Sequence, residues 1–189
     1  EVVQIVVEDT EGEDGTEQYR TVYGFDDSGR LLRKAFITDP TGSPSYWCES
    51  WKLKTASGKP YRLDEYRMPS AHDVTSDSEA TQFLNPYPGG SWSNDTATLR
   101  SSDGLIYVYD YDSNGLCTGT KVKKGTGGTA YFVQGNTYST NGSRVTASYY
   151  YPTSVTTQSS GKQTSYSYTY YDMDDRQIKT RVTTLPEIS

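Results

Sequence analysis

One short pattern occurs twice in this chain: a tyrosine, any residue, an aromatic residue, an aspartate, two further residues and a glycine. The copies run from Tyr23 to Gly29 and from Tyr109 to Gly115. Aromatic residues two positions apart share one face of a β-strand. An aspartate with glycine three residues later is typical of a tight turn, because the carboxylate can cap turn amides and glycine accepts a positive φ. Each copy therefore predicts a β-hairpin.

A weaker third copy runs through Tyr171 and Asp172, with Asp175 in the place of the glycine. The three copies predict hairpin turns at residues 26–29, 112–115 and 172–175. A pattern repeated in this way indicates a structural unit rather than a catalytic site. The residues that define the repeat are Tyr23, Phe25, Asp26, Gly29, Tyr109, Tyr111, Asp112, Gly115, Tyr171 and Asp172.

These residues resemble the YD repeats of the RHS (rearrangement hotspot) family. The first copy matches best, because Arg30 and Leu31 follow its glycine and the segment Asp39-Pro40-Thr41-Gly42 closes the next strand. The resemblance implies an all-β fold of stacked antiparallel β-hairpins of YD-repeat type. It also implies a segment of a large secreted or cell-surface protein, whose hairpins wind into shells, tubes or stalks.

The expected organisation is a single all-β unit, residues 1–189, which is a fragment or one unit of a longer chain. Residues 1–68 hold the first YD hairpins, and residues 96–189 hold the second and third. Between them, prolines and glycines predict one long irregular loop at about residues 69–95, which is either functional or packed as a cover. A short helical turn near Asp77–Phe83 is compatible with this loop.

The composition favours a thin sheet structure with a tyrosine-rich core. Only 33% of residues are hydrophobic and the mean hydropathy is −0.77, values that approach those of disordered chains. However, 18 of the 189 residues are tyrosine, which buries a large ring and keeps its hydroxyl in water. The net charge of −6 disfavours nucleic acid as a partner, and no apolar run is long enough for membrane insertion.

Alternating aromatic residues line several expected strands, and two interpretations of them are open. The rows pack across neighbouring hairpins and seal the core, or they are exposed and stack on sugar rings. We favour packing, because alternating aromatics are how such strands would build a core. The residues concerned are Tyr19, Tyr23, Phe25, Trp47, Trp51, Tyr107, Tyr109, Tyr111, Tyr166, Tyr168 and Tyr170.

The sequence favours no catalytic chemistry. The single histidine, His72, lies beside Asp73 in the loop, but no Gly-x-Ser-x-Gly motif accompanies it. We therefore assign no catalytic residues and expect no enzymatic activity. The two cysteines, Cys48 and Cys117, form one disulfide in an oxidising compartment or remain two buried thiols.

One segment partly matches a calcium-binding loop. Asp110, Asp112 and Asn114 have the spacing of its first half, but Lys121 stands where the last ligand should be glutamate. The first copy of the repeat has Gly24 at the position of Asp110, so these acids also serve as ordinary hairpin residues. They are a weak metal candidate, and we expect no cofactor.

Two tripeptides match the acceptor sequence for N-linked glycans, at Asn94 and Asn141. Both fall in expected loops or turns, so covalent glycans are compatible with an extracellular or cell-surface location.

The main functional hypothesis is a non-enzymatic structural segment that builds a fibre, stalk or shell wall. The alternative is a glycan-binding β module that uses exposed Tyr and Trp rows. The run from Glu1 to Val7 is the most β-prone in the chain, and an uncovered apolar strand is prone to associate. We therefore expect copies of the chain, or neighbouring repeat units, to pack head to tail through this strand.

Overall fold

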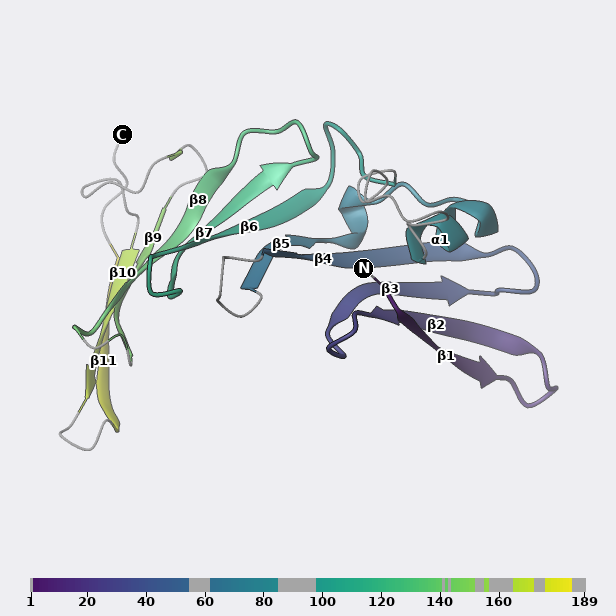
Figure 1. Cartoon of the computed structure of the whole chain (residues 1–189), viewed down its shortest axis with the longest axis horizontal. Coiled ribbons are helices and arrows are strands. Elements are labelled where there is room, and N and C mark those ends of the chain that lie inside the picture. Colours follow the sequence, from purple (N-terminus) through teal and green to yellow (C-terminus); the bar gives the residue numbers. More distant parts are fainter. Residues whose placement is uncertain are drawn as a thin grey trace. The chain divides into compact units, whose positions relative to one another are not determined.

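In the computed structural model of the chain, the regular secondary structure is almost entirely antiparallel β-strand (Figure 1). The structure describes residues 2–54, 62–84, 98–140, 142, 144–151, 155–156, 165–171 and 176–184. Eleven strands follow one another in a single sheet, in the order in which they occur in the chain. This arrangement confirms the predicted all-β fold of antiparallel hairpins.

The strands are connected in sequence, so neighbours in the chain are neighbours in the sheet. They are β1 (Gln4–Glu11), β2 (Glu17–Phe25), β3 (Leu31–Thr38), β4 (Ser45–Lys54), β5 (Arg62–Arg67), β6 (Leu105–Tyr111), β7 (Cys117–Lys124), β8 (Tyr131–Tyr138), β9 (Val145–Tyr150), β10 (Ser165–Tyr171) and β11 (Gln177–Thr184). The first strand begins at Gln4 and extends to Glu11, further along the chain than the run from Glu1 to Val7 predicts.

Two compact units can be distinguished along the chain. The first comprises Glu1–Ile106 together with Lys124–Gly128, and the second comprises Tyr107–Lys123 and Thr129–Ser189. None of the helices in the described part of either unit is long and apolar enough to cross a membrane.

The turn at residues 26–29 is stabilised by both the backbone and the side chain of Asp26. The Asp26 amide donates to the Arg30 carbonyl (2.9 Å), and the Asp26 carbonyl accepts from the Gly29 amide (3.0 Å). Oδ1 of Asp26 also accepts the amides of Ser28 and Arg30 at 3.0 and 2.8 Å. Gly29 has a φ of 74°, as expected for a turn that ends in a left-handed residue.

The turn at residues 112–115 repeats this arrangement bond for bond. The Asp112 amide donates to Leu116 and its carbonyl accepts from Gly115, both at 3.0 Å. Oδ1 of Asp112 accepts the amides of Asn114 and Leu116, both at 2.9 Å. Gly115 has a φ of 89°. The first two predicted hairpin turns are therefore confirmed.

The third predicted turn, residues 172–175, lies outside the described residues, and Asp172 with it. The strands on either side of it, β10 and β11, pair antiparallel up to Tyr171 and Gln177. The same backbone pattern also occurs where the motif is absent: the Gly12 amide donates to Thr16, and the Gly12 carbonyl accepts from Gly15. The hairpin geometry is therefore more general than the sequence pattern that predicts it.

The predicted loop at residues 69–95 is partly helical. A short 3₁₀ turn, η1 (Pro69–Ala71), is followed by the helix α1 (Asp77–Leu84). The helix begins with a capping arrangement, in which Ser76 Oγ accepts the Glu79 amide and Glu79 Oε2 accepts the Thr75 amide. This finding corrects the loop prediction for residues 69–71 and 77–84, leaves residues 72–76 irregular, and confirms the helical turn proposed near Asp77–Phe83. Residues 85–97 lie outside the described residues.

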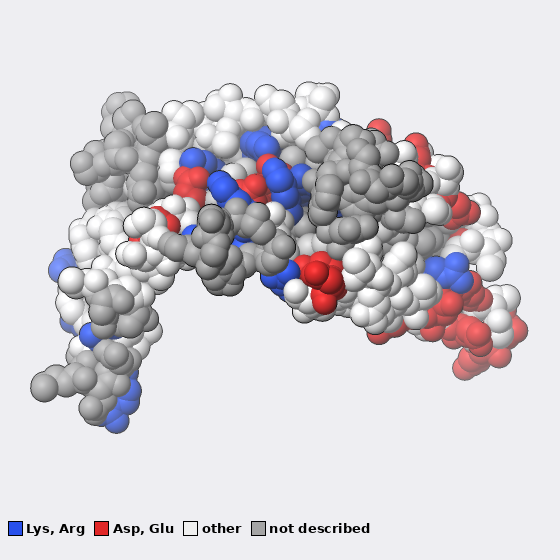
Figure 2. Space-filling view, viewed as in Figure 1, with Lys and Arg blue, Asp and Glu red and all other residues white. Residues whose placement is uncertain are grey.

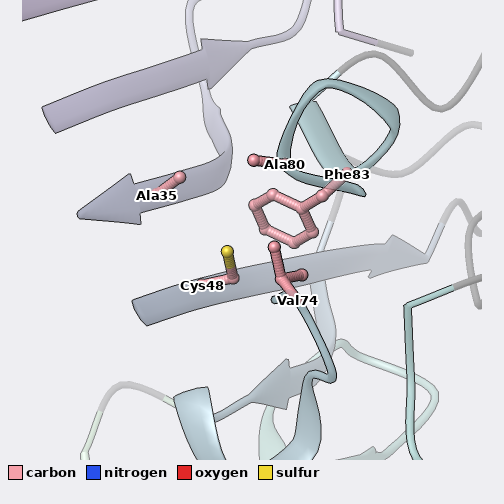
Figure 3. Close-up of a cluster of buried hydrophobic side chains, with 5 residues drawn as sticks. All are labelled: Ala35, Cys48, Val74, Ala80 and Phe83. Atoms are coloured by element: carbon pink, nitrogen blue, oxygen red, sulfur yellow. The ribbon is translucent and has the colours of Figure 1, made fainter. Parts of the chain in front are cut away.

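Helix α1 acts as a cover for one face of β2, β3 and β4. The buried cluster between the helix and the strands comprises Ala35, Cys48, Val74, Ala80 and Phe83 (Figure 3). The ring of Phe83 points from the helix toward the strands, where small side chains leave room for it. The core of the first unit is thus built from a helix and small strand residues.

The second unit has a smaller apolar cluster. Phe132, Tyr151 and Val155 are buried there, and Tyr149 packs against them. Gly119 lies under the Phe132 ring, where a Cβ atom would come within 2.5 Å of the ring edge. A glycine at this point in β7 therefore allows the ring to pack on the strand.

Candidate functional site

His72 belongs to a buried polar cluster in the first unit. Its Nε2 lies 3.0 Å from Ser50 Oγ and its Nδ1 lies 3.1 Å from Thr98 Oγ1. The imidazole also makes an edge contact with Phe83 of α1, at 4.9 Å between ring centroids. Ser50 is fully buried. A serine and a histidine in contact resemble part of a hydrolase site, but the buried Ser50 hydroxyl is not accessible to a substrate. The cluster instead connects β4 with the segments that pack on it, through His72 and its contact with Phe83.

Asp73, which is beside His72 in the sequence, takes no part in this cluster. Its carboxylate accepts from Arg100 Nη2 at 2.9 Å, on the surface. The structure therefore does not bring the two sequence neighbours together as a catalytic pair.

The acids of the calcium-like segment have other partners. Lys121 Nζ lies 2.6 Å from Asp110 Oδ2, so the lysine at the position of the missing ligand neutralises the first acid of the segment. Asp112 uses its Oδ1 to cap the hairpin turn. Within the described residues, no group of three or more His, Cys, Asp or Glu side chains is placed to hold a metal ion.

Both cysteines are free thiols in the structure. Cys48 is buried under α1, and this burial raises the pKa of its thiol to about 12. Cys117 is half-buried, and its pKa is also raised, mainly by burial. The glycosylation candidates Asn94 and Asn141 lie outside the described residues.

The aromatic row of the first unit lies on the sheet face opposite α1. Val22, Ala35 and Cys48 are aligned across β2, β3 and β4 and face the helix. Successive side chains of a strand point to opposite faces, so Phe36 and Trp47, which are paired with each other, point the other way. Trp47 is 58% exposed. The expectation that such rows seal the core is therefore wrong for this row.

Tyr19 lies on the same sheet face as Phe36 and Trp47. Its ring stacks on Phe36 with 5.7 Å between centroids and 16° between the planes, and the residue is 44% exposed. Cross-strand packing of the aromatics is thus confirmed, but it takes place on an open face. We call Tyr19, Phe36 and Trp47 the aromatic platform.

Polar contacts hold further side chains of the same face in place. Tyr66 stacks on Trp51 at 5.6 Å and donates its hydroxyl to Glu49 Oε2 at 2.6 Å. Glu49 Oε1 also lies 3.9 Å from Lys34 Nζ. These contacts place one carboxylate and one ammonium group on the sheet face that carries the platform.

A second exposed aromatic row lies on β10, in the second unit. Tyr166, Tyr168 and Tyr170 alternate along the strand, and the last two are exposed. Tyr166 and Tyr168 make an edge contact at 5.2 Å, and a hydrogen bond with Tyr149 raises the pKa of Tyr168. Of the predicted aromatic rows, only Tyr107, Tyr109 and Tyr111 are half-buried throughout.

The hairpin of β1 and β2 carries a charge cluster that the sequence analysis did not single out. Six of its residues are acidic and only Arg20 is basic, so it holds most of the net charge of the chain. Figure 2 shows the acidic side chains gathered over this hairpin. Arg20 pairs with Asp9 at 2.8 Å and with Glu17 at 2.6 Å. Hydrogen bonding with Asp9 raises the pKa of Glu17, as expected where acids are crowded.

No protein-family model and no curated protein matches this chain.

Proposed function

We propose that the chain is a non-enzymatic structural segment of an extracellular or cell-surface repeat protein, and that it forms part of a fibre, stalk or shell wall. The observation that carries this proposal is the identity of the two turns at Asp26 and Asp112. Each aspartate makes the same four hydrogen bonds to the residues that follow it. One sequence pattern that gives one geometry twice is the property of a structural repeat.

The polar groups that could carry chemistry support the same proposal, because they already serve the fold. His72 joins β4 to the segment that follows η1, and Asp110 pairs with Lys121. Asp26 and Asp112 cap turns. Successive hairpins that satisfy one another's backbone groups form a continuous sheet, and such a sheet is suited to bear load.

The location of the protein inside or outside its source cells tests this proposal. Antibodies against the chain should label intact source cells or their secreted material as strongly as permeabilised cells. An antibody against a cytoplasmic protein, which labels only permeabilised cells, is the control. Labelling that requires permeabilisation, or turnover of a substrate by the purified chain, would contradict the proposal.

The aromatic platform favours a second function, glycan binding. Tyr19 stacks on Phe36, and Trp47 lies opposite Phe36 on the next strand with 58% of its surface exposed. Aromatic rings on an open face can stack on the apolar face of a sugar ring. A carboxylate and an ammonium group on the same sheet face, at Glu49 and Lys34, can form hydrogen bonds with sugar hydroxyls.

A glycan array followed by titration of the best ligand tests this second function. If the platform binds, Trp47→Ala should abolish binding, and Tyr168→Ala on β10 should leave it unchanged. An array without ligands, or equal affinity of the Trp47→Ala variant and the unchanged chain, would remove this function.

A further inference from the structure

β1 and β11 are edge strands within the part of the chain that the structure describes. β1 and β11 stand first and last, and among the described residues β1 pairs with β2 alone and β11 with β10 alone. An edge strand presents unpaired N–H and C=O groups to any strand that can lie beside it. Each of these strands is eight residues long, so they match in length.

The apolar layer of the first unit continues to β1, where the described residues leave its side chains exposed. Val7 lies opposite Val22, which is 5% exposed, yet Val7 itself is 51% exposed. Ile5 lies on the same face as Val7 and is 49% exposed. Helix α1 packs on β2, β3 and β4. We call Ile5 and Val7 the apolar shoulder. The side chains of a neighbouring strand would bury these two residues.

The two edge strands carry opposite charge. β1 contains Glu8, Asp9 and Glu11, all exposed. The stretch from Arg176 to Thr184, which includes β11, contains three basic residues and no acid, and its Lys179 and Arg181 are exposed. Figure 2 colours Lys and Arg blue, and blue atoms lie at the end of the molecule where Figure 1 places β11. Two β1 strands would repel each other, and so would two β11 strands, but β1 and β11 attract.

We propose that β11 of a second copy of this chain pairs antiparallel with β1, in the register that puts Arg181 opposite Asp9. The same register puts Lys179 opposite Glu11, which gives two cross-strand pairs of opposite charge. It puts Thr183 opposite Val7. Because Tyr166 is the partner of Thr183 on β10, the tyrosine row of the second copy shares a face with the apolar shoulder. This inference rests on the proposed structural function and names its partner.

The contact joins different surfaces of the two copies and leaves one free edge on each. Such a contact propagates into a filament when the rotation does not close, and into a ring when it does. Pairing between β1 and β11 therefore makes the chain extend its own sheet.

Analytical ultracentrifugation of the whole chain tests the pairing over about a hundredfold range of concentration, at low salt and at about 0.5 M salt. We expect the mean mass to rise with concentration at low salt and to fall when salt is added. A mean mass equal to that of one chain, 21.1 kDa, at every concentration would overturn the proposal.

Charge reversal at one edge at a time sharpens the test. The variant with Lys179→Glu and Arg181→Glu should associate at least about tenfold more weakly, and so should the variant with Asp9→Lys and Glu11→Lys. Mixing the two variants should restore association, because each then offers a complementary edge. The control for the first variant, Lys54→Glu with Lys124→Glu, lowers the net charge by the same amount on strands inside the order and should associate like the unchanged chain.

Cross-linking supplies a readout for the register if a charge-reversed variant loses its β-sheet circular dichroism. In a Cys117→Ser background, chains with Asp9→Cys should form disulfides with chains carrying Arg181→Cys. Chains carrying Thr180→Cys should not form them, because that side chain points to the other face. Equal cross-linking of both pairs would overturn the register. If the purified chain stays monomeric while antibodies label it on intact cells, this inference is overturned and the proposed structural function stands.

Discussion

At the scale of single residues, Asp26 shows how one side chain organises a hairpin. It accepts two turn amides and pairs with Arg30 Nε at 2.8 Å. Burial alone would raise the pKa of this carboxyl, but the hydrogen bonds from Arg30 and Ser28 outweigh it and hold the pKa below its usual value. The second copy of the motif has Leu116 at the position of Arg30, and a leucine cannot pair with the carboxylate.

This difference gives a matched pair of substitutions. Asp26→Asn keeps the capping oxygen but places an amide against the Arg30 guanidinium, so we expect the free energy of unfolding at pH 7 to fall by about 1–2 kcal/mol. In an Arg30→Leu background, Asp26→Asn should cost less than about 1 kcal/mol, because leucine cannot form an ion pair. Urea unfolding of both variants measures this difference.

The charge of Asp26 also makes stability depend on pH. Because its pKa is lower in the folded chain than the value of about 3.9 in the unfolded chain, the carboxylate stabilises the fold above about pH 4. That contribution is lost as the pH falls through the folded pKa. We therefore expect the difference in stability between the Asp26→Asn variant and the unchanged chain to narrow as the pH falls below about 4. A constant difference from pH 7 to pH 2 would contradict the assignment.

Gly29 tests backbone conformation without a change in packing. Its φ is 74°, and a Cβ atom there would meet nothing within 4 Å. Gly29→Val should therefore reduce the free energy of unfolding by about 1–3 kcal/mol through backbone strain alone. Gly29→Asn should cost less than about 1 kcal/mol, since asparagine tolerates a positive φ. Equal urea midpoints for the two variants would show that the turn relaxes to another conformation.

At the scale of elements, α1 is the cover that gives the first unit a core. Phe83 is buried against Cys48 and Val74, and its ring also lies 5.6 Å from the Arg33 guanidinium. Removal of this one ring leaves a cavity between the helix and the sheet.

We expect Phe83→Ala to reduce the free energy of unfolding by about 3–5 kcal/mol. The exposed neighbour Gln82 serves as the control, and Gln82→Ala should change stability by less than about 0.5 kcal/mol. In a Cys117→Ser background, Phe83→Ala should also speed the labelling of Cys48, whose thiol is protected by burial. Labelling of Cys48 at the same rate with and without the ring would mean that α1 does not cover it.

The sequence predicts the elements better than the faces they present. The turns at Asp26 and Asp112 could be predicted because a turn depends on a few adjacent residues. Alternation also shows that Tyr19, Tyr23 and Phe25 share a face, but it does not show which face is covered. That depends on α1, an eight-residue helix whose strand contacts are distant in sequence. For the same reason the exposure of Trp47 and the burial of His72 could not be predicted.

At the scale of the whole molecule, charge is concentrated where the strand order begins and ends. The hairpin of β1 and β2 is strongly acidic, and the stretch from Arg176 through β11 is basic. An edge strand presents unpaired backbone groups, and edge strands of opposite charge attract each other. A chain that is one unit of a longer sheet would use both edges. This distribution is the feature of the whole molecule that fits the proposed structural role.

Electron cryomicroscopy of the native material tests the structural role most directly. We expect density for this chain inside the wall of a fibre, stalk or shell, with strands on both sides of its first and last strands and the turns at residues 26–29 and 112–115 intact. Native particles in which the chain stands alone, with β1 and β11 open to solvent, would contradict the account.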